Sequence, residues 1–468
     1  MNTIFTILYL LLIASAVIVV VLENGDPIMS HAWILTVIFL PGIGLLLYFL
    51  IGKNHRKSRI ITPEELSELT SHLTADAQPP MHDKYQKLCT LMQRANYAPL
   101  LHSYDTHIYT DFAHMYECML ADIRQARHHV HIQFFKIEDD PVGRELGDLL
   151  IQKAQQGLEV RLIYDAAANL HVDRRFYKHL REGGVEVCSF LKVWDSLFSR
   201  DLNCRNHRKV VVIDGTIGYT GGMNIAERYR KGIHSGIWRD THLRIVGSAV
   251  GELQVAFLAD WRFCTHTLLD RPHLFPAHTH PEGSTPVLTQ IITSGPMDEW
   301  NTVMQGMIQV IAQSRHYLYL QSPYFMPTQP VLVALRNAAL GGVDVRLMLP
   351  ERGDKGILVQ WGSHSYLEEA MRAGVKVYFY TRGYLHAKTL VCDDDFVTIG
   401  STNLDVRSFE QDFEVNAFIY DTALARQQRD IFLRDMQDCL AVDPKEWALR
   451  PKRMRLAESV ARLFVPLL

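Results

Sequence analysis

The sequence predicts an α/β protein built from two tandem copies of one domain, preceded by two apolar segments. The stretch HRKVVVIDGTIGYTGGMN at 207–224 and the stretch HAKTLVCDDDFVTIGSTN at 386–403 have equal length. They share His, Lys, Val, Asp, Gly and Asn at matched positions. Around both stretches, short β-rich runs alternate with longer helical patterns, which favours sheets covered by helices.

The first 52 residues contain two long runs of apolar residues, at 4–22 and 32–51. Each run is about 20 residues long, the length that a helix needs to cross roughly 30 Å of hydrocarbon. The linker at 23–31 contains acidic residues, and a basic cluster follows the second run, formed by Lys53, Arg56, Lys57 and Arg59. Basic flanks stay on the cytoplasmic side, so we expect a two-helix transmembrane anchor at 1–52 in a bacterial inner membrane. Everything after it is then cytoplasmic.

Further repeats set the expected domain boundaries. ARHHVHIQFF at 126–135 resembles SRHYLYLQSP at 314–323, in the same order relative to the shared motif. Such internal similarity indicates duplication of one structural unit. The predicted organisation is a connector at 53–100, a first repeat at 101–285, a second repeat at 286–440 and a basic amphipathic tail at 441–468.

Composition narrows the class of protein. The chain has 468 residues, 48% of them hydrophobic, and a net charge of −3, which argues against a nucleic-acid partner. Its seven cysteines are scattered and form no C-x-x-C pair, which favours a reducing compartment. His128, His129 and His131 lie on one strand-like run. Only two of them share a face, and no third ligand accompanies that pair, so we expect neither a metal nor a cofactor.

Each copy of the motif predicts a hairpin that gathers polar groups at one edge. A two-residue turn at Asp214-Gly215 places His207 opposite Gly222, with Asn224 beside it. The same count about Asp393-Asp394 places His386 opposite Ser401, with Asn403 beside it. His207 and Lys209 alternate by two and share one face of the strand, as do His386 and Lys388. Asp214 and Asp393 complete the motif, but their spacing from the histidines indicates a structural role.

The gathered groups suit a phosphodiester. Lysine and asparagine side chains donate hydrogen bonds, and the loops at Gly222 and Ser401 expose backbone N–H groups that can hold phosphate oxygens. Histidine can act as a nucleophile or carry a proton near neutral pH. One copy provides half of a reaction, whereas two facing copies provide an attacking histidine and a second one that protonates the leaving group. This chemistry requires no metal.

At this point the sequence resembles the phospholipase D superfamily, whose H-x-K-x4-D motif it contains twice, and within it the bacterial cardiolipin synthases. Supporting stretches are TSGP at 293–296, SPYFMP at 322–327 and NLDVRS at 403–408. The resemblance implies tandem phospholipase D-like α/β sandwich domains with the active site at their interface. It also implies reversible phosphatidyl transfer between two phosphatidylglycerol molecules, giving cardiolipin and glycerol through a phosphohistidine.

The resemblance also implies roles for individual residues. His207 is the nucleophile in the commoner family assignment, and His386 is the general acid and then the general base, although this sequence does not fix the order. Lys209, Lys388, Asn224 and Asn403 hold the phosphate. A downstream acid orients each imidazole, and Asp240 and Glu414 stand at fitting places. The chain departs from the family in having Asp at 240, and in having Gly221-Gly222 where Gly-Ser is commoner.

Two further segments are candidates for lipid contact. FLKVWDSLF at 190–198 has a helical apolar stripe and is either an interfacial helix that guides lipid or an ordinary core-facing helix. The tail has a second stripe, formed by Leu456, Val460, Leu463 and Phe464, which fits either an anionic membrane surface or the protein itself.

The sequence therefore predicts a membrane-anchored phosphatidyltransferase with phospholipid substrates. Alternatives with the same intermediate are a phospholipase D-type hydrolase, which uses water as acceptor, and a phosphatidylserine synthase. The anchor favours transfer, because both substrates can arrive in the membrane plane. A non-enzymatic membrane scaffold with an inactive fold is the alternative outside catalysis. The oligomeric state is not encoded in these patterns.

Overall fold

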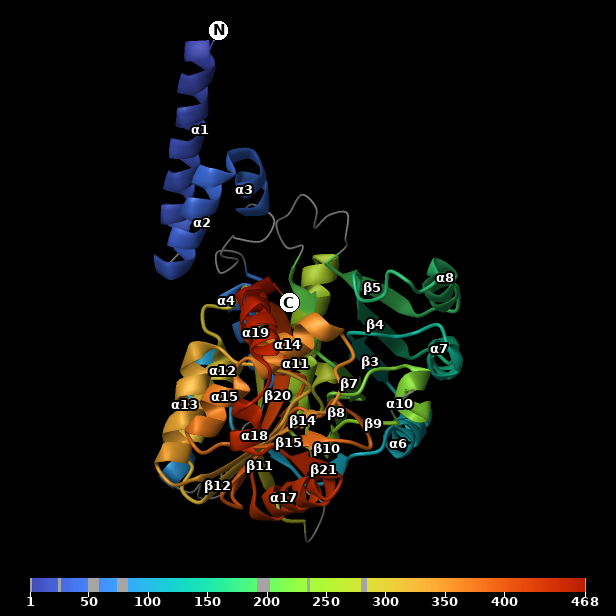
Figure 1. Cartoon of the computed structure of the whole chain (residues 1–468). Helices are drawn as coiled ribbons and strands as arrows, with labels where there is room; N and C mark the ends of the chain where they lie inside the picture. The colour runs from blue at the N-terminus through green and yellow to red at the C-terminus, as the bar shows by residue number, and fades with distance from the viewer. Residues whose placement is uncertain are drawn as a thin grey trace.

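The computed structural model describes residues 2–23, 27–48, 59–73, 83–191, 203–233, 236–278 and 284–467. Within them, the first repeat forms a mixed sheet in the order β2-β10-β8-β7-β3-β4-β5. Its strands are β2 (His107–Tyr109), β3 (His129–Phe134), β4 (Glu159–Asp165), β5 (Glu186–Phe190), β7 (Val210–Ile213), β8 (Ile217–Gly221) and β10 (His242–Val246). Helices α6 (Phe112–Gln125), α7 (Pro141–Gln155) and α8 (Arg174–Glu182) lie along its outer side (Figure 1).

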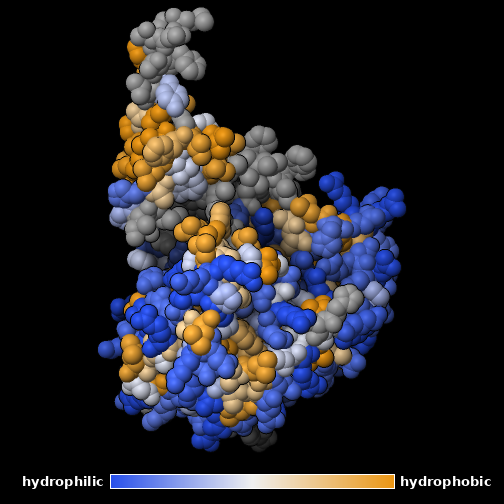
Figure 2. Space-filling view, viewed as in Figure 1, coloured by the Kyte–Doolittle hydropathy of each residue, from blue (hydrophilic) through white to orange (hydrophobic). Residues whose placement is uncertain are grey.

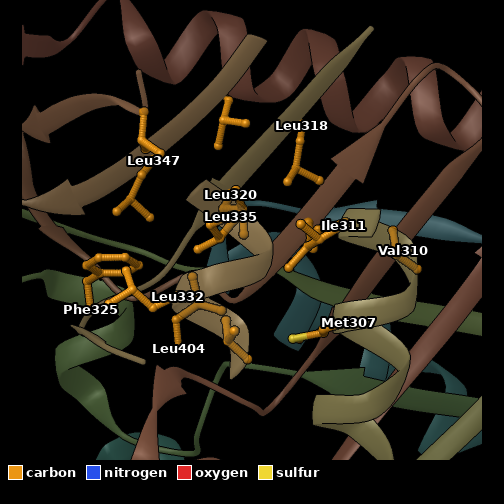
Figure 3. Close-up of a cluster of buried hydrophobic side chains, with 14 of the residues drawn as sticks. Met307, Val310, Ile311, Leu318, Leu320, Phe325, Leu332, Leu335, Leu347 and Leu404 are labelled. Atoms are coloured by element: carbon orange, nitrogen blue, oxygen red, sulfur yellow. The ribbon is translucent and has the colours of Figure 1, made fainter. Parts of the chain in front are cut away.

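The second repeat forms a mixed sheet in the order β1-β11-β20-β18-β17-β12-β14-β15-β21. Its strands are β1 (Leu101–Ser103), β11 (Val287–Ser294), β12 (Tyr317–Gln321), β14 (Asp344–Pro350), β15 (Lys376–Tyr380), β17 (Thr389–Cys392), β18 (Phe396–Gly400), β20 (Asp412–Tyr420) and β21 (Cys439–Ala441). Its outer helices are α12 (Thr302–Gln313), α13 (Gln329–Leu340), α14 (Ile357–His364) and α15 (Leu367–Arg372). Figure 3 shows Leu318, Leu320 and Leu347 of this sheet packed against side chains of α12 and α13.

A shared hydrophobic core joins the repeats. Along β7, Val210 and Val212 contact this core, whereas Val211 and Ile213 contact the outer helices of the first repeat, as the alternation of a strand requires. Residues of the second sheet, such as Val397, join the same core. Helices α11 (Val250–Thr265) and α17 (Thr422–Met436) also pack into it. The tandem α/β architecture expected from the repeats is therefore present.

The connector packs on the second repeat. It contains α4 (Pro63–Thr70), a short 3₁₀ turn at Asp83–Tyr85 and α5 (Gln86–Asn96). Nζ of Lys84 donates to Asp393 over 2.6 Å, which ties the connector to the second motif. Strand β1 follows and pairs with β11 of the second sheet.

The N-terminal segment is helical but differs in detail from the expected hairpin. Helix α1 (Asn2–Glu23) covers the first apolar run, while the second run is divided between α2 (Pro27–Phe39) and α3 (Pro41–Leu47). Leu40 has φ −133° and ψ 62°, and Pro41 begins a new helix because it has no N–H to continue the first. A continuous second helix at 32–51 was therefore a wrong prediction. Among the described residues, no helix has both the length and the apolar character needed to cross a membrane.

The C-terminal tail ends in α18 (Pro444–Ala448), α19 (Lys452–Leu463) and a 3₁₀ turn at Val465–Leu467. Helix α19 docks on the second repeat, with Arg455 3.2 Å from Glu368 and Arg462 3.5 Å from Glu369. Its other face carries exposed leucines, and Figure 2 shows hydrophobic residues gathered in this part of the surface, on the side of the N-terminal helices. The segment at 190–198 begins at the end of β5, and from residue 192 it lies outside the described residues.

Candidate active site

A short strand from each repeat crosses to the other repeat just before its histidine. In the first repeat, β6 (Arg205–Asn206) pairs in parallel with the start of β20. The backbone N–H of His207 then donates to the carbonyl oxygen of Phe413 over 2.9 Å. The residue after Phe413 is Glu414. The backbone of the second repeat thus brings its own acid to the histidine of the first.

The second repeat makes the reciprocal crossing. Strand β16 (Gly383–Leu385) pairs in parallel with β9 (Ile237–Arg239) of the first repeat. The backbone N–H of His386 donates to the carbonyl oxygen of Arg239 over 2.7 Å, and the next residue is Asp240. Backbone pairing therefore fixes the positions of both histidines.

Each imidazole contacts the carboxylate that this crossing supplies. Nδ1 of His207 lies 3.0 Å and 3.1 Å from the two carboxyl oxygens of Glu414, and Nδ1 of His386 lies 2.6 Å from Oδ2 of Asp240. An ionised carboxylate only accepts hydrogen bonds, so Nδ1 carries the proton in each ring. The lone pair is then on Nε2, the atom that remains for chemistry.

Burial keeps both imidazoles neutral. It lowers the pKa of His207 well below its usual value, and the nearby Lys209 and Lys388 lower it further. Burial and Lys388 lower the pKa of His386 to about 4, although Asp240 opposes this. Burial alone would raise the pKa of Asp240, yet Lys388 and His386 hold it below its usual value. The resting site therefore contains neutral imidazoles, which can act as nucleophiles.

The two lysines of the motifs are buried beside the histidines. Nζ of Lys209 donates to the carbonyl oxygen of His207 over 2.6 Å, and Nζ of Lys388 donates to that of His386. Burial lowers the pKa of Lys209 to about 7 and that of Lys388 to about 8. An anionic ligand stabilises the charged form of such lysines, so the site gains positive charge where a phosphate binds.

The motif aspartates lie away from the histidines and bind backbone. The carboxylate of Asp214 accepts hydrogen bonds from the N–H groups of Arg127, His128 and His129. That of Asp393 accepts from those of Arg315, His316 and Tyr317. Each aspartate therefore holds the start of a neighbouring strand, as its spacing indicated. Neither belongs with the catalytic groups among which the motif alone would place it.

The hairpin register differs from the prediction by one residue. Ile213 pairs with Ile217 and Cys392 pairs with Phe396, so Thr216 and Asp395 are additional turn residues. The turns begin with left-handed residues, with φ 52° at both Asp214 and Asp393, and this geometry leaves one residue outside the ladder. Gly222 and Ser401 are therefore not the direct partners of the histidines.

The motif asparagines lie in different environments. Nδ2 of Asn224 donates to the hydroxyl of Tyr229 over 2.7 Å, and its Oδ1 accepts the backbone N–H of Lys136. Asn403 is buried, and in the part of the chain that the structure describes its Oδ1 has no hydrogen-bond partner. A buried polar atom without a partner is costly, so Asn403 is the asparagine more available to a ligand.

Gly222 in the first motif leaves space for the carboxylate of Asp240 in the same repeat. A Cβ atom at Gly222 would lie 2.1 Å from Oδ1 of Asp240, so serine does not fit there. In the second repeat, the hydroxyl of Ser401 donates to the longer Glu414 and also accepts the N–H of Val415. The small Gly222 therefore accompanies Asp240 in the first repeat. In the second repeat, Ser401 accompanies Glu414. The Ser401 hydroxyl supports the carboxylate rather than facing a ligand.

Sequence reasoning missed several residues of this site. Arg208, between the motif His and Lys, forms a buried ion pair of 2.7 Å with Asp260 and donates to the backbone carbonyl of Glu414. The sequence signal for Arg208 was its position between the motif residues His207 and Lys209. Aromatic rings line the second histidine, with the centroids of Trp238 and Tyr384 at 5.3 Å and 5.7 Å from that of His386.

Potential metal ligands lie elsewhere and already have partners. In the described ranges, the group with suitable geometry is Cys392, Asp393 and Asp395, and the Lys84 ammonium binds both of its carboxylates. The buried His129 and His131 share the side chain of Gln254. Neither group contacts the motif histidines.

The site contains two carboxylate-oriented histidines and two buried lysines on a duplicated α/β fold. These features define an enzyme that acts on phosphodiesters, of the phospholipase D class. The sequence model described as "Cardiolipin synthase, PLD-like domain" matches residues 119–248 and 307–436, and the phospholipase D-nuclease N-terminal model matches residues 7–53. The chain belongs to the cardiolipin synthase family of this class.

Curated relatives match along nearly the whole chain. It is 37% identical to a cardiolipin synthase of Geobacillus sp. (strain WCH70), covering 96% of this chain and 91% of the relative. It is 36% identical to the major cardiolipin synthase ClsA of Bacillus subtilis (strain 168), covering 100% of this chain and 99% of the relative. Among solved structures, a phosphatidylserine synthase of Haemophilus influenzae shares the fold, with a TM-score of 0.62, 14% identity and coverage of 82% and 98% of the two chains.

The carboxylate contacts generate a first prediction. Asp240→Asn and Glu414→Gln keep the side-chain size but remove the charge that holds each Nδ1 proton. We expect either substitution to lower kcat by about 10²- to 10⁴-fold, because the wrong tautomer is no longer disfavoured. Turnover of a lipid phosphodiester is the measurement, with Asp438→Asn, a surface partner of Arg382, as the control. Unchanged turnover in both variants would contradict the orienting role.

The lysines generate a second prediction, on pH. A lysine loses its charge as pH rises through its own pKa, about 7 for Lys209 and about 8 for Lys388. We therefore expect kcat/KM, which reports groups of the free enzyme, to fall as pH rises through this range. Ordinary lysines would keep their charge to about pH 10. A profile that stays level up to that pH would show that burial does not lower the lysine pKa values.

Proposed function

We propose that this chain is a cardiolipin synthase that transfers a phosphatidyl group from one phosphatidylglycerol molecule to another, releasing glycerol. The observation that carries the proposal is the reciprocal pairing of His207 with Glu414 and of His386 with Asp240, which makes one site from two repeats. Family membership over nearly the full chain supplies the substrate class.

In the first half-reaction, Nε2 of His207 attacks the phosphorus of the donor lipid. The bond from phosphorus to the glycerol headgroup oxygen breaks, and His386 in its protonated form gives that oxygen a proton. Glycerol leaves and the phosphatidyl group remains on His207. Binding of the phosphate anion favours the protonated form of His386, which is neutral in the empty site.

In the second half-reaction, His386 is neutral and accepts the proton of a headgroup hydroxyl from the second phosphatidylglycerol. The hydroxyl oxygen attacks phosphorus, and the bond between phosphorus and His207 breaks. Cardiolipin forms and His207 is regenerated. Glu414 and Asp240 stabilise positive charge on the imidazoles as it develops in each half. The second half-reaction is the chemical reverse of the first with a different alcohol. The direction of the overall reaction therefore follows the lipid and glycerol concentrations.

Other motif residues hold the phosphate. Lys209 and Lys388 neutralise charge on its equatorial oxygens, and Asn224 and Asn403 take part through their amides. The buried Oδ1 of Asn403 supports a contact with a ligand hydroxyl, because only a donor satisfies it. At Gly222 and Ser401, the backbone N–H groups already bind Thr241 and Val415, so these residues act through the carboxylates beside them.

The enzyme works at the bacterial inner membrane with its catalytic repeats on the cytoplasmic side. The apolar runs at 4–22 and 32–51 and the basic residues that follow them support an anchor at 1–52. The remaining ranges of the proposed organisation are the connector at 53–100, the repeats at 101–285 and 286–440 and the tail at 441–468. Helix α19 adds a membrane contact, since Leu456 and Leu463 are 66% and 77% exposed on its outer face.

Product analysis tests the proposed reaction. Purified full-length protein with phosphatidylglycerol vesicles is expected to yield cardiolipin and glycerol in equal amounts, quantified by mass spectrometry. Phosphatidic acid as the sole product would replace transfer with hydrolysis. Phosphatidylserine formed on addition of serine would replace it with serine transfer.

His207→Ala is the matching variant and is expected to abolish product formation, because no other side chain replaces the nucleophile. The control is His128→Ala, since His128 is exposed and contributes its backbone rather than its ring to the motif aspartate. Cardiolipin levels in cells that stay normal with His207→Ala would support the inactive scaffold instead.

The outer face of α19 generates a further prediction. Leu456→Ser combined with Leu463→Ser is expected to raise the KM for phosphatidylglycerol in mixed micelles by roughly tenfold, as apolar insertion is lost. The kcat and Tm should stay unchanged, because both leucines point away from the protein. Leu340→Ser, at an exposed leucine of α13, is the control. An unchanged KM would show that α19 serves only to dock on the second repeat.

A further inference from the structure

A carboxylate with two tyrosine hydroxyls lies beside the second histidine. Oδ1 of Asp354 accepts hydrogen bonds from the hydroxyl of Tyr324 over 2.6 Å and from that of Tyr384 over 2.7 Å. The hydroxyl oxygens of Tyr384 and Tyr324 lie 3.1 Å apart. The ring of Tyr384 is the one that lies 5.7 Å from the imidazole of His386. None of these three residues takes part in the two half-reactions.

The cluster is held to the active site by its neighbours in sequence. Tyr384 is in β16, two residues before His386. Tyr324 precedes β13 (Phe325–Met326), which pairs in parallel with β19 (Leu404–Asp405), directly after Asn403. Asp354 is in the exposed loop 351–356 between β14 and α14. Two buried tyrosines therefore meet an exposed loop near His386.

A cation accompanies the carboxylate. Nζ of Lys355 lies 4.8 Å from the ring centroid of Tyr324. Its charge is close enough to disfavour protonation of His207, and that of Asp354 is close enough to favour protonation of His386. The loop thus presents a negative and a positive group next to each other, and both influence the charge of the motif histidines.

The first repeat has no such cluster at the equivalent place within the described residues. At the end of β4, Asp165 accepts the backbone N–H groups of Ala168 and Asn206, both over 2.8 Å. Asn169 bridges the backbone of Phe135 and Ile137. Beside His207 lies the ring of Phe135, at 4.9 Å between centroids. The ring beside His207 is therefore apolar and the chain around it is held by backbone contacts, whereas a carboxylate with two hydroxyl groups lies near His386.

We propose that Asp354, Tyr324 and Tyr384 form a subsite for the glycerol headgroup, and that Lys355 binds the phosphate of the acceptor lipid. The inference rests on the proposed function. The leaving group and the attacking group are both glycerol hydroxyls, and both exchange a proton with His386. One glycerol subsite next to His386 therefore serves both half-reactions. The carboxylate accepts from a second glycerol hydroxyl while the first faces phosphorus.

This subsite is expected to disfavour water and simple alcohols as acceptors. A site built to hydrogen-bond a hydroxyl discriminates against molecules that lack it, because its own polar groups then lose that partner. Free glycerol has no phosphate, whereas acceptor phosphatidylglycerol has one. Asp354 and Lys355 are therefore separable, since only the lipid acceptor engages Lys355.

The reverse reaction tests the carboxylate. Wild-type protein with cardiolipin is supplied with glycerol or with 1-propanol, which has a single hydroxyl, and the new phosphatidyl alcohols are quantified. Asp354→Asn is expected to reduce the preference for glycerol over propanol by about 10- to 100-fold, the effect of one hydrogen bond to a charged group. Glu351→Gln removes a carboxylate from the same exposed loop and is the matched control, with an unchanged preference expected.

The outcomes distinguish a failure of the proposed function from a failure of the glycerol subsite. If wild-type protein transfers to neither alcohol and makes no cardiolipin, the proposed function fails. If the wild type is active but Asp354→Asn slows both alcohols equally, Asp354 only supports the fold and the inference is overturned. Tyr324→Phe, which removes a single hydroxyl, provides a second variant should Asp354→Asn not fold, and a reduced glycerol preference is again expected.

Lys355→Gln tests the acceptor phosphate. It is expected to raise the KM for phosphatidylglycerol in cardiolipin formation at least tenfold more than it raises the KM for glycerol in the reverse reaction. Equal effects on both KM values would overturn the assignment of Lys355.

Discussion

The active site depends on a reciprocal exchange of backbone hydrogen bonds between the two repeats. The N–H of His207 binds the carbonyl of Phe413, and the N–H of His386 binds that of Arg239. Since Glu414 and Asp240 follow these carbonyls directly, one crossing sets both the position of a histidine and its carboxylate partner. Neither repeat contains a complete pair. The shared hydrophobic core holds the two sheets in the arrangement that this exchange requires.

Burial then gives the site its chemistry. Both histidines are 8% exposed, and the lysines and carboxylates around them are buried almost completely. In these surroundings the imidazoles are neutral and the lysines lose part of their preference for the charged form, so an arriving phosphate completes the charge balance. The two sides of the site are not equivalent. Phe135 lies beside His207, whereas Trp238 and Tyr384 lie beside His386, and Tyr384 donates to Asp354.

Asp240 and Glu414 were expected only from the resemblance to the phospholipase D superfamily. The sequence itself predicted the duplication and the motif residues, because these depend on local spacing. It predicted the structural role of Asp214 and Asp393 for the same reason. The crossing of His207 to Glu414 could not be read from periodicity, because β6 and β16 are too short to have a pattern and pair only in the folded protein. The extra turn residues at Thr216 and Asp395 depend on left-handed backbone that non-glycine residues seldom adopt. Asp354 was missed because a loop aspartate has no signature until Tyr324 and Tyr384 approach it.

The most direct test of the account is to trap the intermediate. A phosphatidyl ester of p-nitrophenol needs no general acid to leave, so His386→Asn protein can still form the covalent bond but has no base to activate the acceptor. Rapid quenching and peptide mass spectrometry are expected to find the phosphatidyl group on His207, with one nitrophenol released per site. His207→Asn protein is expected to form no adduct. An adduct on His386 in that variant, or none in His386→Asn protein, would contradict the account.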